Sequence, residues 1–177
     1  SDPWLRLRLA RLYLKTGAID AARGLVDGLL VSHPDMPDAL YASALIDADT
    51  GEWQRASATL ERIPVARRSA AITALQRRAT VHLLTGNASA LGRQRRAQEA
   101  YAQLAQAESI AGNDSELMHE VASLYADLGD APRAVGVMRQ LMARSVNRNV
   151  DVQLAYAGLL LRTRQDVELA GILRQLQ

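Results

Sequence analysis

Apolar side chains recur at helical spacing along most of the chain, and short polar turns interrupt them. In the first segment Leu5, Leu9 and Leu12 lie three or four positions apart, which puts them on one face of a helix over about residues 3–16. No stretch alternates strictly between apolar and polar residues, so we expect no β-strands. Aromatic residues make up only 4% of the chain, and Ala and Leu dominate its apolar positions, which favours closely packed helices. The pattern predicts an all-α fold.

Glycine marks the turns between these helices at a regular interval. Gly17 and Gly51 lie 34 positions apart, and each follows one amphipathic segment and precedes another. A helix–turn–helix unit of this period is typical of repeats that stack into a solenoid. Gly86 and Gly129 continue the series at intervals of 35 and 43 positions, and Gln165 stands in place of the last turn glycine.

The pattern predicts about five helix pairs, over residues 3–34, 37–64, 67–111, 114–146 and 149–177. Pro34 and Pro64 end the first two pairs, because the residue before a proline avoids the helical region. The third pair is nine residues longer than the period. Either its second helix is about two turns longer, or Gly92 breaks it. We favour the break, because glycine inside a helix costs about 1 kcal/mol relative to alanine. The segment with Gly86 and Gly92 is therefore the best hinge candidate.

Small residues recur at fixed places in the helices. The first helices carry Ala10, Ala44, Ala79, Ala122 and Gly158, and the second helices carry Ala22, Ala56, Ala134 and Ala170. On these residues and the 34-residue period, the chain resembles the tetratricopeptide repeat family. The resemblance implies a right-handed superhelix. Tyr13 and Tyr125 match the family's aromatic position, whereas Asp47 and His82 depart from it, and Arg6 and Leu40 replace its early tryptophan.

A narrower resemblance rests on several short stretches. They are residues 2–7 leading into 9–13, residues 37–42, residues 60–64 ahead of Arg67 and Arg68, residues 124–130 and residues 153–161. These stretches are similar to the repeat region of the C-subunit family of bacterial cellulose synthase, which are cellulose export proteins. The resemblance implies a periplasmic scaffold ahead of an outer-membrane β-barrel that exports cellulose, with a glucan chain or periplasmic synthase-complex proteins as partners. The chain opens with Ser1 and Asp2 rather than Met, so we expect it to be a fragment of a longer protein.

Charge and composition exclude several function classes. The net charge is +2, from 21 basic and 19 acidic residues that are interleaved, so we expect no nucleic-acid partner. The absence of Cys excludes disulfides and thiolate zinc sites. No apolar run approaches the roughly 20 residues that span a bilayer. Arg93, Arg95 and Arg96 form the densest basic stretch, which is either a solvated face or a contact for an acidic protein.

No catalytic constellation is visible, and we expect a non-enzymatic chain without metal or cofactor. His33, His82 and His119 lie on separate helices and form no metal-binding pair. We expect His33 at a helix end, His82 in a part-buried position and His119 facing the groove. Asp47 stands where an aromatic residue belongs, and a buried carboxylate needs a partner. We expect it to pair with Arg77 or Arg78, or to be a polar point in the groove.

The surface that a superhelix offers to partners is the concave one, lined by the first helices. Counted from each turn, its lining is Trp4, Arg11, Lys15, Asp38, Tyr41, Asp49, Gln76, Thr80, Glu116, His119, Asp127 and Arg162. Trp4 and Tyr41 could stack on sugar rings while the carboxylates and Gln76 bind hydroxyl groups. The alternatives are a hydrated groove, Trp4 packed on a preceding repeat, or a groove that holds a partner's peptide segment. Trp53 is expected to pack between helices.

The last helix carries an apolar stripe of Leu169, Ile172, Leu173 and Leu176 with no polar helix after it. Solenoid ends need caps for solubility, so an uncovered end should associate with something. We therefore expect possible self-association through the exposed solenoid ends.

Overall fold

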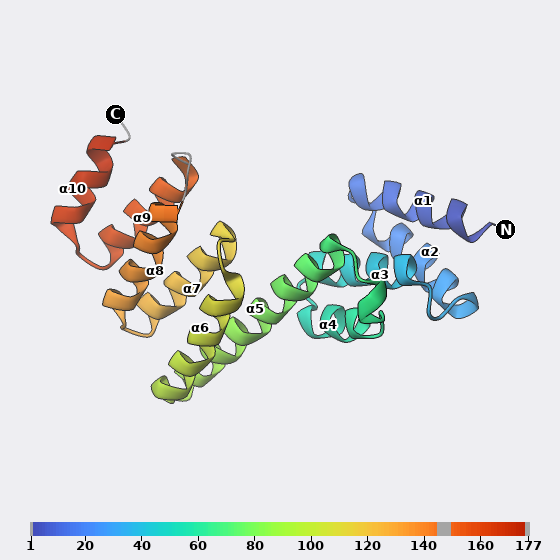
Figure 1. Ribbon diagram of the computed structural model, residues 1–177, viewed down its shortest axis with the longest axis horizontal. Coiled ribbons are helices and arrows are strands. Elements are labelled where there is room, and N and C mark those ends of the chain that lie inside the picture. Colours follow the sequence, from blue (N-terminus) through green and yellow to red (C-terminus); the bar gives the residue numbers. More distant parts are fainter. Residues whose placement is uncertain (1, 145–149, 176–177) are drawn as a thin grey trace. The chain divides into compact units, whose positions relative to one another are not determined.

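The computed structural model describes residues 2–144 and 150–175, and the regular structure in these residues is entirely helical (Figure 1). The prediction of an all-α fold is confirmed. The helices are α1 (Pro3–Lys15), α2 (Ile19–Ser32), α3 (Pro37–Asp49), α4 (Trp53–Glu61), α5 (Ala70–Arg93), α6 (Ala97–Ala111), α7 (Ser115–Asp127), α8 (Ala131–Arg144), α9 (Val150–Arg162) and α10 (Asp166–Gln175), with a short 3-10 helix at Val65–Arg67. No described helix is both long and apolar enough to cross a membrane.

The chain divides into two compact units, residues 1–80 and 81–177, with the boundary inside α5. In the first unit, one apolar cluster joins α1, α2 and α3 around Leu7, Val26 and Leu29. A second cluster joins α3, α4 and the first half of α5, with Leu40 and Leu60 among its buried members. In the second unit, one continuous cluster runs from the second half of α5 to α10. Each unit therefore has its own core.

Aspartates cap the N-termini of α1 and α7. An Oδ1 oxygen of Asp2 accepts a hydrogen bond of 2.9 Å from the backbone N–H of Trp4. Asp114 accepts from the backbone N–H groups of Glu116 and Leu117, both at 3.2 Å. These contacts satisfy amides that have no partner inside the helix. The N-terminus predicted at Asn113–Asp114 is confirmed.

Each helix pair turns on one residue in the left-handed conformation. These residues are Gly17, Gly51, Arg95, Gly129 and Arg164, with φ values of 77°, 76°, 61°, 89° and 57°. In each turn the next residue donates its N–H to a carbonyl five residues back, for example Ala18 to Tyr13 at 2.9 Å and Arg96 to Leu91 at 3.0 Å. This is the Schellman ending of a helix. The turn residues lie 34, 44, 34 and 35 positions apart.

The turn predicted at Gly86 is wrong. Helix α5 continues through Gly86 and Gly92 to Arg93, so the extra residues belong to the first helix of the third pair. The second helix, α6, has an ordinary length of 15 residues. The break that we favoured near Gly92 corresponds to the end of α5, and the turn itself is made by Arg95. Glycine misled the prediction because a helix can contain it at a modest cost, about 1 kcal/mol. The hinge expected in this segment stays a prediction.

The corrected turns also correct the register of the small residues. Seven positions before each turn residue stand Ala10, Ala44, Ala88, Ala122 and Ala157, which are 0–8% exposed. Five positions after it stand Ala22, Ala56, Ala100 and Ala134, all fully buried, and then Leu169. The predicted equivalents Gly158 and Ala170 are exposed instead, and Ala79 is buried but precedes the repeat position. Leu91, not His82, takes the aromatic position of the third pair.

Candidate binding face

An ion pair joins the first helices of the first two pairs. Arg11 Nη2 of α1 lies 2.9 Å from Asp38 Oδ1 of α3, and both side chains are about half exposed. Both residues belong to the predicted groove lining. The structure therefore brings together two of the predicted residues, across adjacent first helices.

A cleft of about 360 Å³ lies beside the start of α1. Its lining is Asp2, Trp4, Leu5, Leu7, Arg8 and Arg11. Trp4 is 57% exposed. An open indole face next to guanidinium and carboxylate groups can stack on a flat apolar ring face and bind hydroxyls around it. The sequence identified Trp4 and Arg11 but missed Arg8, because one more arginine in a basic helix carries no signal of its own.

The other predicted residues of the first unit are more scattered. Lys15 and Asp49 are exposed, each two positions before its turn, and Tyr41 is half buried. Gln76 donates its amide N–H to Ser57 Oγ of α4 at 3.0 Å, and the Thr80 hydroxyl donates to the backbone carbonyl of Gln76 at 2.9 Å. The structure thus places Gln76 against a second helix, because its expected position was counted from Gly86. Its role in a groove stays a prediction.

Two first helices are likewise joined in the second unit. Arg162 of α9 lies 3.4 Å from Asp127 of α7 and donates to the backbone carbonyl of Ser123 at 3.1 Å. A second cleft of about 360 Å³ lies between α7, α8 and α9. Glu116 and His119 line it together with Ser115, Met138, Leu141, Asp151, Val152 and Ala155. The structure therefore places Glu116 and His119 in one cleft, and Asp127 in an ion pair.

His82 is part buried, as expected, with 18% of its side chain exposed. Its Nδ1 atom lies 3.0 Å from Glu120 Oε2, and the Thr85 hydroxyl donates to Glu120 Oε1 at 2.5 Å. These contacts tie α5 to α7 within the second unit. His33 ends α2, where its Nδ1 atom lies 3.0 Å from Ser32 Oγ. Both histidines have the structural places that the sequence predicted.

Asp47 does not pair with Arg77 or Arg78. Its Oδ1 atom lies 2.9 Å from Arg23 of α2 and 3.4 Å from Arg55 of α4, and the side chain is only 2% exposed. The prediction failed because Asp47 is close to the turn at Gly51, where α2 and α4 are its neighbours. Two arginines therefore compensate the buried carboxylate.

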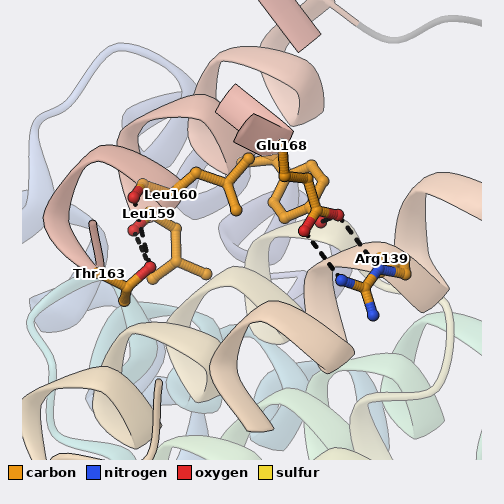
Figure 2. Close-up of polar contacts among 6 residues, drawn as sticks. Arg139, Leu159, Leu160, Thr163 and Glu168 are labelled. Carbon is orange, nitrogen blue, oxygen red and sulfur yellow. Dashed lines mark hydrogen bonds and ion pairs between the residues drawn. The ribbon is translucent and has the colours of Figure 1, made fainter. Parts of the chain in front are cut away.

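The last three helices are joined by a hydrogen-bonded cluster (Figure 2). The guanidinium of Arg139 on α8 donates to both oxygens of Glu168 on α10, at 3.1 and 2.9 Å, and the Tyr156 hydroxyl on α9 also donates to Glu168. The hydrogen bond from Arg139 is the main reason that the pKa of Glu168 lies below its usual value. Burial, followed by the carboxylate, raises the pKa of Tyr156 to about 12. The arrangement is that of a structural clamp.

Arg133 covers a pair of stacked tyrosines in the same unit. The rings of Tyr101 and Tyr125 lie 6.2 Å apart, and the Arg133 guanidinium carbon lies 5.7 and 5.8 Å from their centres. No group of three or more potential metal-ligating side chains occurs among the residues that the structure describes.

Comparisons with known proteins agree with this architecture. A family model described as tetratricopeptide repeat matches residues 1–44. Over 99% of its length the chain is 42% identical to "Cellulose synthase operon protein C" of Xanthomonas axonopodis pv. citri and 39% identical to the protein of that name from Pseudomonas fluorescens. It spans only 12% and 14% of the length of those two relatives.

Solved structures with the same fold are more distant in sequence. A thermophilic tetratricopeptide repeat protein of Thermus thermophilus aligns with 98% of the chain and 89% of its own, at a TM-score of 0.54 and 24% identity. A tetratricopeptide repeat protein of Parabacteroides merdae aligns with 99% of the chain and 64% of its own, at a TM-score of 0.59 and 18% identity. At these identities the likeness concerns the fold alone.

Proposed function

Because the chain belongs to the tetratricopeptide repeat family, we propose that it is a non-catalytic interaction module of a cellulose synthesis and export system. The observation that carries the proposal is the 42% identity, over nearly the whole chain, to one segment of cellulose synthase operon protein C. The module would guide the glucan or dock proteins of the synthase complex. Its place would be the periplasm, ahead of an outer-membrane channel in the longer protein.

The cleft beside α1 is the part of the first-helix face best suited to a glucan. Cellulose offers flat apolar ring faces with equatorial hydroxyl groups at their edges. Trp4 can stack on such a face, and Arg8, Arg11 and Asp38 can bind hydroxyls. One aromatic platform in an open cleft fits weak binding, with a Kd on the order of 1 mM. Such binding suits a polymer that must keep moving.

Titration with cellohexaose tests this proposal. In a Trp53→Phe variant, Trp4 is the sole tryptophan, so its fluorescence reports the cleft directly. We expect a saturable change that Arg11→Ala weakens about tenfold. Maltohexaose, which has the same sugar with a different linkage, serves as the matched control. No change with cellohexaose at millimolar concentration, or an equal change with maltohexaose, would contradict glucan recognition.

The second candidate is a module that binds a peptide segment of a partner protein. Charged residues of both signs on the first helices favour it, namely Arg11, Lys15, Asp38 and Asp49 of the first unit. Periplasmic and cytosolic extracts passed over the immobilised chain separate the candidates. Retention of a periplasmic protein that cellohexaose does not displace supports protein docking. Retention from cytosol alone contradicts the periplasmic placement.

A further inference from the structure

The outer face of α1 carries apolar side chains that no described residue covers. Leu5 and Leu12 are 65% and 56% exposed. They stand twelve and five positions before the turn residue Gly17. At the same two positions of α3 stand Ala39 and Ile46, which are 0% and 1% exposed because α2 packs against them. The exposed leucines of α1 therefore occupy positions where the repeat normally receives a preceding second helix.

The second unit follows the same rule. The residues twelve positions before the turns of α7 and α9 are Leu117 and Val152, which are 2% and 5% exposed. Each of these first helices follows a second helix in the chain. Burial of this position therefore comes from the neighbouring pair and not from the first helix itself.

Helix α10 presents the opposite half of the same interface. Nine positions after their turns, the four earlier second helices carry Val26, Leu60, Leu104 and Met138, and all four are fully buried. The residue at this position of α10 is Leu173, which is 48% exposed. Next to it on α9, Leu154 is 55% exposed, whereas Leu7 at the same position of α1 is 2% exposed. One molecule thus carries both halves of a repeat interface, each without its counterpart.

The charges on the two faces are complementary. Within the second unit, Glu120 of α7 meets His82 of α5 at 3.0 Å. These residues stand nine and thirteen positions before their respective turns. The same register brings Arg8 of α1 opposite Asp151 of α9 when α1 follows α10. By contrast, α1 has four basic residues and no acidic one, so two α1 faces repel each other.

We propose that a second copy of this chain docks head to tail, with α1 of one copy packed on α9 and α10 of the other as a further step of the repeat. The interface is heterologous, since different faces of the two copies meet. Arg8 and Asp151 set its register, and the exposed leucines supply its apolar area. This association is independent of what the first-helix face binds.

Sedimentation velocity over a concentration series tests the proposal. We expect the average mass of the wild-type chain to rise above the monomer mass of 19.3 kDa. The doubles Leu5→Asp/Leu12→Asp and Leu154→Asp/Leu173→Asp should each stay monomeric, since each destroys one face. Val31→Asp/Val65→Asp, at two residues that are 87% and 78% exposed, is the matched control and should associate like the wild type. Circular dichroism verifies that the variants are folded.

A mixture of the two leucine doubles gives the sharpest result. Each supplies the face that the other lacks, so an equimolar mixture should form a species of two chains and none larger. In addition, Arg8→Asp should weaken wild-type association about tenfold, while Arg67→Asp should leave it unchanged. A wild-type chain that stays monomeric overturns the proposal and assigns both faces to helix pairs of a longer polypeptide. Association that persists in both leucine doubles, or is insensitive to Arg8→Asp, also overturns it.

Discussion

Arg95 and Gly129 lie 34 positions apart and hold the same left-handed turn, with φ values of 61° and 89°. In both turns the following N–H reaches back to a carbonyl five residues earlier, Arg96 to Leu91 at 3.0 Å and Asp130 to Tyr125 at 2.8 Å. An arginine therefore does the conformational work of a glycine in the third pair. The left-handed region costs a residue with a side chain roughly 1–2 kcal/mol.

Replacing Arg95 with glycine should stabilise the second unit. The strain of the left-handed turn disappears, although glycine loses more entropy on folding, so we expect the free energy of unfolding to rise by about 0.5–1 kcal/mol. Arg93→Gly, two positions earlier in α5, should lower it by about 1 kcal/mol, because that residue is helical. Urea unfolding followed by circular dichroism measures both. A destabilising Arg95→Gly would contradict the assigned turn.

The sequence was sufficient for the helices whose turns use glycine. Gly17, Gly51 and Gly129 have positive φ and were recognised, since glycine is the residue that adopts this conformation without a steric penalty. Arg95 and Arg164 could not be recognised, because arginine carries no turn signal and only the surrounding packing holds it there. Gly86 looked like a turn because it lies 35 positions after Gly51. The register of the third pair was lost with it.

The candidate face was predictable to the extent that the register was right. Arg11 and Asp38 were counted from correct turns, and they meet in the structure. Gln76 was counted from Gly86 and lies against Ser57 of α4. The partners of Asp47 depend on which helices surround the Gly51 turn in space. Hydrophobic periodicity does not contain that information.

The two arginines around Asp47 should contribute unequally to the stability of the first unit. Arg23 is 2.9 Å from the carboxylate and only 26% exposed, whereas Arg55 is 3.4 Å away and 62% exposed. We expect Arg23→Ala to cost about 2 kcal/mol, because it leaves a buried charge poorly compensated, and Arg55→Ala less than about 1 kcal/mol. In an Asp47→Leu background the cost of Arg23→Ala should nearly vanish. Equal costs in both backgrounds would contradict a direct interaction.

Alanine at the two interior glycines of α5 should have opposite effects. A Cβ atom at Gly86 meets nothing within 4 Å, whereas one at Gly92 comes within 2.3 Å of Leu128 Cδ2. Gly86→Ala should therefore stabilise by about 0.5–1 kcal/mol through helix propensity. Gly92→Ala should destabilise by about 1 kcal/mol, since Leu128 must move. Adding Leu128→Ala should make Gly92→Ala favourable again, and a cycle without this coupling would exclude the contact.

The Arg139–Glu168–Tyr156 clamp should give the stability two pH-dependent arms. Glu168 has a lowered pKa when folded, so its contribution is complete above pH 4.5, the ordinary carboxyl value, and is lost as the pH falls below it. The pKa of Tyr156 is raised from 10.0 to about 12, so the folded state holds this proton more tightly. Stability is then constant below pH 10 and falls between pH 10 and 12, by about 1–2 kcal/mol.

Tyr156→Phe should remove the alkaline arm, and Glu168→Gln should weaken both arms. The wild type and the two variants are compared by urea unfolding across pH 3–5 and pH 9–12. Ultraviolet titration of tyrosinate checks the assignment independently, because the variant should lose the tyrosine that ionises last. Tyr41→Phe, at a tyrosine outside the clamp, is the control and should leave both arms unchanged. An alkaline arm that survives Tyr156→Phe would mean that another group, such as Tyr125 with its own raised pKa, carries it.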